Sequence, residues 1–284
     1  MRPSRPAAAG LELPRAALRI RRNILRLIRA GRAGHVGGAL SMADVLAALY
    51  FQVMEIDPNR PDWPQRDRLV VSAGHKALVL YAALAARGYF PEELLDTYGS
   101  LDSRLPGHPD MHKLPGVEAS TGSLGHGLSV ATGMALGLRL SGLGSRVYVV
   151  MGDGELAEGS NWEAAAAASH HRLENLVVIV DRNGLQICGP TAEVMACEPM
   201  EERWRSFGWS VRRIDGHEFP QMVGTLQAAP FETGRPSAIL ADTVKSRGFS
   251  FAEGKAEYHY WKPSAEELGQ AERDLEAIER SLAR

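Results

Sequence analysis

Two short apolar runs, residues 146–151 and 176–180, restrict the fold of this chain more than any other feature of its sequence. Both are rich in β-branched residues and are too short for buried helices, which indicates strands. The alanine-rich stretch between them, residues 161–172, favours a helix. A strand, a helix and a second strand form a right-handed βαβ unit with parallel strands. The carboxyl ends of both strands then lie side by side at one edge of the sheet.

The same alternation of strand and helix continues along the chain. Further strands are expected at residues 67–75, 208–216 and 237–244, and helices at residues 41–54, 76–89, 91–99, 127–142 and from 264 onward. This order predicts an α/β fold, a parallel sheet with helices on both faces. Such sheets bind ligands at the carboxyl ends of their strands. Functional residues are therefore expected in the loops that follow Val71, Met151, Val180 and Leu240.

Local signals mark several helix ends and the limits of the domain. Ser41 is a candidate N-cap, Pro91 suits a first helical position, and Ser264 with Glu267 has the spacing of a capping box. We expect a single α/β domain over residues 11–284, with a C-terminal helix at 264–283, and a disordered tail at residues 1–10.

Composition excludes several classes of protein. The formal net charge of −2 favours neither nucleic acid nor an anionic membrane, and no run of about 18 apolar residues indicates a membrane span. Arginines between residues 15 and 32 alternate with apolar residues, which predicts the solvated face of an amphipathic helix. The two cysteines, Cys188 and Cys197, fit neither a zinc site nor a disulfide framework. A cytoplasmic location is expected.

Oxygen-bearing side chains follow the two strands of the βαβ unit. The first strand ends in Gly152-Asp153-Gly154, and the second ends in Asp181-Arg182-Asn183-Gly184. A carboxylate, an amide oxygen and a nearby backbone carbonyl are the hard ligands that Mg²⁺ prefers, with phosphate oxygens and water completing its octahedron. The flanking glycines allow sharp turns and close approach to a ligand. A turn in which Asp153 only caps the next helix is the alternative for this motif taken alone. The chain has neither a dinucleotide-binding nor a P-loop fingerprint.

Histidines follow glycine unusually often in this chain. Five of the nine do so: His35, His75, His108, His126 and His217. A preceding glycine frees the loop, so that the imidazole can point into a cleft. Neutral imidazoles both donate and accept hydrogen bonds, which suits sugar hydroxyls, and near pH 7 they can transfer protons.

Six motifs that run in order along the chain resemble the diphosphate-binding domain of transketolases. They are residues 34–51, 67–84, 107–136, 152–164, 181–191 and 208–218. The spacing of Gly152-Asp153-Gly154 and Asn183 matches the signature of thiamine-diphosphate enzymes. The resemblance extends over residues 15–284 and is strongest to the separately encoded N-terminal subunit of split transketolases.

The resemblance implies roles for particular residues. Asp153, Asn183 and the carbonyl of Leu185 would bind Mg²⁺ or Ca²⁺. Contacts with thiamine diphosphate would come from His75, Gly122, Ser123, Leu124, Gly154, Asn183, Lys245 and His259. The catalytic set would be His35, His75, His108, Glu158 and His259. His35 and His108 would bind the sugar, and His259 would contact both cofactor and substrate. Glu158 would join a proton network across the subunit interface. His112, His170, His171 and His217 are expected to be structural, His126 to support the site from behind, and the cysteines to have no role.

Several positions depart from the pattern of the family. A lysine follows His75 instead of preceding the glycine, and Ser246 occupies a glycine position. The largest departure is His259-Tyr260-Trp261, where His-Gly is usual. Two aromatic rings beside a substrate histidine would reshape the sugar pocket.

The resemblance also implies a partner. In this family the glutamate that activates the cofactor and the aromatic residues that stack on its pyrimidine belong to a second domain, to which no residue of this chain corresponds. We therefore expect a C-terminal transketolase subunit, an α2β2 assembly, and transfer of a two-carbon ketol unit from a ketose to an aldose, with sugars or sugar phosphates as substrates. Two alternatives remain. One is half of another thiamine enzyme that delivers a two-carbon unit to a carrier protein in secondary metabolism, and the other is a non-catalytic binding module.

Overall fold

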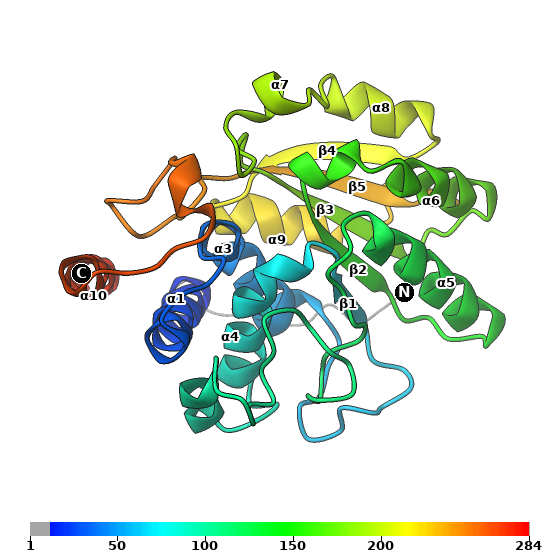
Figure 1. Ribbon diagram of the computed structural model, residues 1–284. Helices are drawn as coiled ribbons and strands as arrows, with labels where there is room; N and C mark the ends of the chain where they lie inside the picture. The colour runs from blue at the N-terminus through cyan, green and yellow to red at the C-terminus, as the bar shows by residue number, and fades with distance from the viewer. Residues whose placement is uncertain (1–11, 284) are drawn as a thin grey trace.

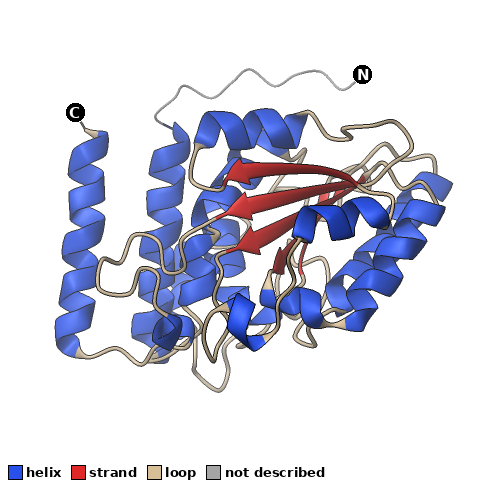
Figure 2. Ribbon diagram, turned by 90° about the horizontal axis from the view of Figure 1, so that it is seen from above, coloured by secondary structure: helices blue, strands red, loops and turns tan. Residues whose placement is uncertain are grey.

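Five parallel strands form one sheet between two layers of helices (Figure 1). The structure, a computed structural model, describes residues 12–283. Every pair of neighbouring strands is parallel, in the order β1-β2-β3-β5-β4. The strands are β1 (Arg68–Val71), β2 (Val147–Gly152), β3 (Leu176–Arg182), β4 (Ser210–Asp215) and β5 (Ser237–Asp242). The predicted parallel α/β fold is confirmed, and the long arrows of Figure 2 point the same way.

Helices cover both faces of the sheet. The α-helices are α1 (Glu12–Gly31), α2 (Gly37–Ser41), α3 (Ala43–Ala48), α4 (Ala77–Arg87), α5 (His126–Leu140), α6 (Gly159–His170), α7 (Thr191–Val194), α8 (Met200–Ser206), α9 (Phe219–Gln227) and α10 (Ala265–Leu282). Short 3₁₀ helices are η2 (Gly74–Lys76), η3 (Glu92–Thr97), η4 (Gly154–Ala157) and η5 (Ala256–His259), and η1 (Leu49–Val53) is a π-helix. In Figure 1, α5, α6 and α8 lie on one side of the sheet, and α1, α3, α4 and α9 lie on the other.

Alternate residues of each central strand enter opposite cores. Tyr148 and Val150 pack with the layer that contains α1, α4 and α9, whereas Val149 and Met151 pack with α5, α6 and α8. Because both faces are covered, the central strands read as continuous apolar runs instead of alternating ones. No helix among residues 12–283 is long and apolar enough to cross a membrane.

The register of the sheet brings the predicted site residues together. Gly152 at the end of β2 lies opposite Asp181 near the end of β3. The motifs that begin at these positions therefore start from neighbouring points of one sheet edge. This is the arrangement that the βαβ pattern predicted.

Two local predictions are wrong. Ser41 does not cap a helix, because it ends α2 and its buried hydroxyl donates to the Asp181 carboxylate (2.6 Å), with the Gly38 carbonyl 3.0 Å away. Pro91 precedes η3 in an extended conformation and is not its first residue. The predicted capping box at Ser264 is confirmed, since its side chain and that of Glu267 each accept a bond from the other's backbone N–H.

The arginines of α1 are only partly a solvated face. Three of them form ion pairs: Arg19 with Glu92 of η3, Arg22 with Glu279 of α10, and Arg26 with Asp96 near the end of η3. Arg21 contradicts the prediction, because it is buried and forms a two-bond ion pair with Asp44 of α3. The predicted tail, residues 1–10, lies outside the described residues, and the single-domain boundary at residue 11 stays a prediction.

Candidate active site

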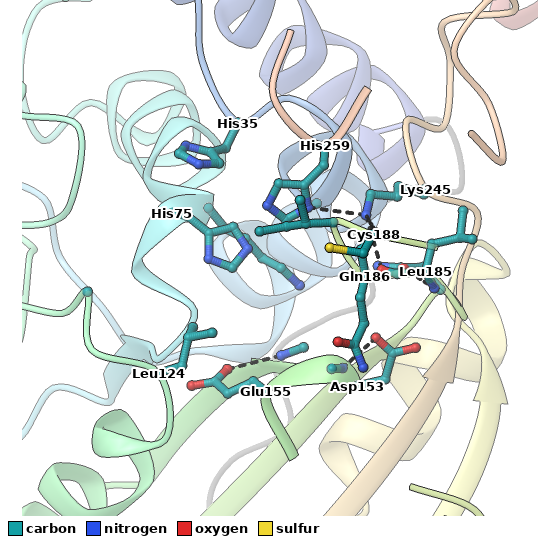
Figure 3. A pocket seen from close by; sticks show the side chains of 17 residues that line it. His35, His75, Leu124, Asp153, Glu155, Leu185, Gln186, Cys188, Lys245 and His259 are labelled. Atoms are coloured by element: carbon teal, nitrogen blue, oxygen red, sulfur yellow. Dashed lines mark hydrogen bonds between the residues drawn. The ribbon is translucent and has the colours of Figure 1, made fainter. Parts of the chain in front are cut away.

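A cavity of about 350 Å³ opens at the carboxyl edge of the sheet (Figure 3). Loops that follow β1, β2, β3 and β5 line it, as the strand pattern predicted, together with residues from the segments before α2 and at the end of η5. The predicted site residues in its wall are His35, His75, Gly122, Leu124, Asp153, Gly154, Asn183, Leu185, Lys245 and His259.

Three further predicted residues lie next to the cavity instead of in its lining. The His108 ring is 6.2 Å from the His35 ring, measured between centroids. Ser123 is exposed and lies between two lining residues. Glu158 is also exposed, at the start of α6, beside Gly125. A role for Glu158 therefore concerns the outer surface of this chain and not the cavity interior.

One wall of the cavity carries the oxygen atoms predicted for a metal. The buried Asp153 carboxylate accepts bonds from the backbone N–H groups of Gly154 (2.8 Å) and Gly184 (2.7 Å). Gly184 has a φ of +74°, a conformation that favours glycine and lets the chain turn back toward Asp153. Burial, and next the neighbouring Asp181, raise the pKa of Asp153. A bound cation would offset both effects by favouring the charged form.

Asn183 and Leu185 complete that wall. The Asn183 side-chain oxygen accepts from the Leu185 N–H (3.1 Å), and its amide nitrogen donates to Asp181 (3.0 Å). The Leu185 carbonyl faces the ammonium of Lys245 (3.0 Å) and so points toward the cavity. Among residues 12–283, no group of three or more His, Cys, Asp or Glu side chains is placed to bind a metal. The candidate metal site therefore consists of one carboxylate, one amide and one carbonyl.

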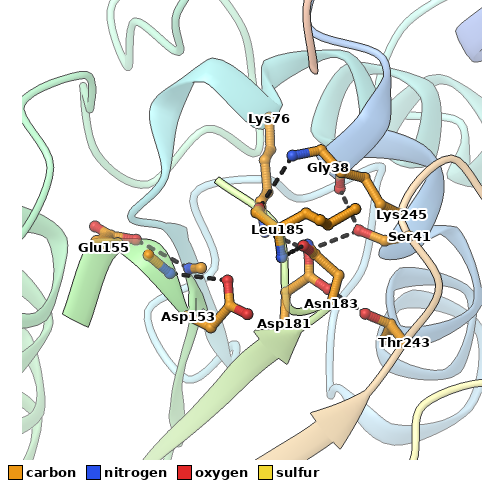
Figure 4. Close-up of polar contacts among 12 residues, drawn as sticks. Gly38, Ser41, Lys76, Asp153, Glu155, Asp181, Asn183, Leu185, Thr243 and Lys245 are labelled. Atoms are coloured by element: carbon orange, nitrogen blue, oxygen red, sulfur yellow. Dashed lines mark hydrogen bonds and ion pairs between the residues drawn. The ribbon is translucent and has the colours of Figure 1, made fainter. Parts of the chain in front are cut away.

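Sequence analysis missed the charged cluster behind this wall (Figure 4). The Asp181 carboxylate is completely buried and accepts hydrogen bonds from Lys76 (2.5 Å), Ser41 (2.6 Å), Asn183 (3.0 Å) and Thr243. Burial alone would raise the pKa of Asp181, but Lys76 and the other donors lower it below its usual value. Through the bond from its amide nitrogen to Asp181, this cluster fixes the side chain of Asn183. The displaced lysine after His75 was the signal that could have indicated it.

Glu155 is a second buried carboxylate that sequence analysis missed. It accepts from the Ser72 hydroxyl (2.5 Å) and from the backbone N–H groups of Gly125 (2.9 Å) and Gly152 (3.1 Å). Burial raises its pKa. These bonds tie the turn after β2 to the end of β1 and to the start of α5.

Three imidazoles line the opposite side of the cavity. The ring of His35 lies 5.4 Å from that of His75 and 5.5 Å from that of His259, and the rings of His75 and His259 are 5.1 Å apart. Burial, and next the nearby lysines, lower the pKa of His75 to about 2 and that of His259 to about 3. Burial also lowers the pKa of His35. These rings are therefore neutral at pH 7 and can each donate and accept one hydrogen bond.

Lys245 enters the cavity between the metal wall and the imidazoles (Figure 3). Its ammonium donates to the Leu185 carbonyl and lies 3.2 Å from Nδ1 of His259. Burial, and next Lys76, lower its pKa to about 8. A Cβ atom on Gly37 would come within 2.9 Å of Lys245 Cε, so the backbone can lie this close to the lysine side chain only because residue 37 is a glycine.

The two aromatic residues after His259 have separate functions. Trp261 is buried against Phe249 and Phe251, and its backbone pairs in both directions with that of Gly34. Tyr260 is half-exposed, with its ring centroid 4.8 Å from that of His35. The unusual pair thus fixes the His259 segment beside His35.

Gln186 and Cys188 also line the cavity and were not predicted. The Gln186 amide nitrogen is buried and, among the described residues, has no hydrogen-bond partner. A Cβ atom on Gly154 would come within 2.8 Å of Gln186 Cγ. An unsatisfied donor and two buried lysines around a glycine turn suit an anionic group such as a diphosphate.

The fold and the cavity define a class of protein: a parallel α/β domain with a cation-lined pocket at the carboxyl edge of its sheet. Residues 15–277 match the family described as transketolase, thiamine diphosphate binding domain. The chain belongs to this family.

Two relatives of similar length are described as transketolase subunits. The chain is 47% identical to the 6-deoxy-6-sulfo-D-fructose transketolase subunit SqwG of Clostridium sp. (strain MSTE9), over 94% of this chain and 97% of that one. It is 42% identical to an apulose-4-phosphate transketolase subunit of Phocaeicola vulgatus, over 92% of each chain.

Solved transketolases have the same fold. The enzyme from Leishmania mexicana superposes with a TM-score of 0.86 at 30% identity, over 95% of this chain and 44% of that one. The enzyme from Campylobacter jejuni gives 0.87 at 29% identity, over 95% and 45%. This chain therefore spans less than half the length of these two solved transketolase chains.

Proposed function

We propose that this chain is the N-terminal subunit of a two-subunit, thiamine-diphosphate-dependent transketolase, which transfers a two-carbon ketol unit from a ketose to an aldose. One observation carries the proposal. In a member of the transketolase family, a single cavity contains the Asp153–Asn183 oxygen wall, a buried lysine and a set of neutral imidazoles. The relatives named as transketolase subunits, which match the chain over nearly its full length, support it.

Mg²⁺, or Ca²⁺ in its place, would bind to Asp153, Asn183 and the Leu185 carbonyl. The chemistry of these three oxygen donors supports the assignment, because hard cations prefer carboxylate, amide and carbonyl oxygens. With a single carboxylate, the set leaves room for phosphate oxygens and water to complete the octahedron. Asp153 is buried beside Asp181, which raises its pKa, and a bound cation would favour its charged form.

The diphosphate of the cofactor would lie against the metal and the ammonium of Lys245. Further contacts would come from His75, Gly122, Ser123, Leu124, Gly154, Asn183 and His259. Thiamine diphosphate, when bound, supplies the nucleophilic carbon to which the two-carbon unit is attached. This chain contributes binding and orientation, and its neutral imidazoles are the groups able to hold or move protons at the sugar hydroxyls.

The sugar would bind at the imidazole side of the cavity. His35 and His108 would hydrogen-bond its carbonyl and hydroxyl end, and His259 would contact both sugar and cofactor. The named substrates of the two relatives are a sulfo-sugar and a sugar phosphate, so we propose an anionic sugar, such as a sugar phosphate, for this chain.

A partner subunit would complete the active site. It would carry the pyrimidine-binding domain and the activating glutamate, and an α2β2 assembly in the cytoplasm would join two such sites. The solved transketolases, whose chains are more than twice the length matched here, support this division. The exposed Glu158 would then meet the neighbouring subunit in a proton network. Residues 11–284 would form one domain of this assembly.

The test is reconstitution with a C-terminal transketolase subunit. The two chains should co-purify, bind thiamine diphosphate in the presence of Mg²⁺, and transfer ketol units across a panel of ketoses and aldoses. Full activity of this chain alone would refute the two-subunit proposal.

Asp153→Ala should abolish metal-dependent binding of the cofactor. Asp242→Ala is the matched control, because it removes a carboxylate from the end of β5 outside the main cavity. Unchanged binding in the Asp153 variant would remove the metal assignment. Transfer of the two-carbon unit to a carrier protein, with no transfer to aldoses, would favour the alternative enzyme.

A further inference from the structure

The turn that carries Lys245 is held from outside the active site. Ser246, the next residue, has a φ of +64° and donates its N–H to the Gly37 carbonyl (3.0 Å). A left-handed conformation at a residue with a side chain is unfavourable unless neighbouring contacts impose it. Contacts on both sides of Ser246 are therefore required to keep Lys245 directed into the cavity.

These contacts come from a buried network that the proposed chemistry does not use. His217 Nε2 accepts the N–H of Val244 (2.9 Å), and its Nδ1 lies 2.7 Å from Oδ2 of Asp44. Asp44 also forms two bonds of 2.7 Å with Arg21. Arg21 Nε in turn donates to the carbonyl of Arg247 (3.0 Å). The network thus starts at one side of Lys245 and returns to the chain at the other.

The hydrogen bonds define the protonation states of His217 and Asp44. Because a backbone N–H can only donate, Nε2 of His217 carries no proton, and the ring is neutral with its proton on Nδ1. That proton is donated to Asp44. Although burial alone would raise the pKa of Asp44, Arg21 and next His217 hold it well below its usual range. The carboxylate is thus ionised, and it orients the imidazole toward Val244.

We propose that His217 is a positioning residue for Lys245: oriented by the Arg21–Asp44 pair, it fixes the turn at Val244 and so directs the lysine ammonium at the cofactor's diphosphate. The inference rests on the proposed function, in which Lys245 binds that diphosphate. A purely structural role, in which the network only joins α1 to α3 and to the loop before α9, makes a different prediction.

Two substitutions of His217 separate these roles. In His217→Asn, the amide nitrogen replaces Nδ1 and keeps the bond to Asp44, but nothing accepts the Val244 N–H. In His217→Gln, the amide oxygen reaches the position of Nε2 and keeps the bond to Val244. A purely structural role, in which the bond to Asp44 joins α3 to the loop before α9, would affect His217→Gln at least as strongly as His217→Asn.

The primary readout is binding of thiamine diphosphate, at fixed Mg²⁺, to this chain reconstituted with the C-terminal subunit, measured by calorimetry. Losing one buried hydrogen bond should weaken binding about fivefold in His217→Asn. His217→Gln should stay within about twofold, the bond being retained. Lys245→Met sets the reference, and adding His217→Asn to it should cause no further loss. Equal affinities for both His217 variants, or a full additional loss in the double variant, would overturn the inference.

Amide hydrogen exchange of residues 243–249 provides a second readout that needs no ligand. The exchange rate in this segment should rise about tenfold in His217→Asn and stay unchanged in His217→Gln. The same rate in both variants would contradict the inference even if the wild-type chain binds the cofactor as proposed. Failure of the wild-type chain, reconstituted with the C-terminal subunit, to bind thiamine diphosphate would instead contradict the proposed function.

Discussion

Replacing Lys76 with methionine should destabilise the protein strongly, although the two side chains have similar lengths. Lys76 and Asp181 are 2% and 0% exposed, and Nζ lies 2.5 Å from Oδ2. The substitution leaves a carboxylate buried without a countercharge. Removing one partner of a buried ion pair typically costs about 3–5 kcal/mol. Because Ser41, Asn183 and Thr243 still donate to Asp181, we expect a loss near the lower limit, about 3 kcal/mol.

Equilibrium unfolding in urea would measure this loss for Lys76→Met, Asp181→Asn and the double variant. Removing both charges should cost less than the sum of the single losses, with a coupling free energy of about 2 kcal/mol. Lys262→Met is the matched control, since Lys262 is exposed and its substitution should change stability by less than about 0.5 kcal/mol. Additive losses, or a Lys76 variant as stable as the control, would refute the assignment of a coupled buried pair.

Three further predictions concern other parts of the structure. Asp44→Asn should cost about 3 kcal/mol at neutral pH by breaking the pair with Arg21. The pKa of Asp44 lies below its usual 3.8, so the wild type loses this stability as the pH falls below 3.8, whereas the variant does not. The urea midpoints of the wild type and the variant should therefore converge at low pH. A gap between them that stays constant with pH would contradict the argument. The His75 and His259 imidazoles, with pKa values of about 2 and 3, should show no NMR titration from about pH 8 to about pH 5. Ser264→Ala should cost about 1 kcal/mol in urea unfolding by removing the capping box of α10, and no change would mean that the cap is not formed in solution.

The fold could be predicted because its determinants are local. The continuous apolar runs of β2 and β3 can satisfy both faces only in a sheet covered on both sides. The parallel connection then places Asp153 and Asn183 at one edge, so their presence in one cavity followed from the order of the elements.

The supporting charges could not be predicted, because their partners lie far apart in the sequence. Nothing local distinguishes Arg21 from the exposed arginines of α1, yet it is buried opposite Asp44. Ser41 has the composition of a cap, but a buried carboxylate from β3 competes for its hydroxyl. Burial decides these cases, and burial is a property of the assembled layers.

The backbone pairing of Gly34 with Trp261 has a consequence for how the protein is made. One side of the pair is among the first described residues to leave the ribosome, and the other is among the last. A nascent chain can form the central strands early, since β2 and β3 are close in sequence. The wall that holds His35 beside His259 closes only after Trp261 has emerged, so competence to bind the cofactor would arise later than the central strands.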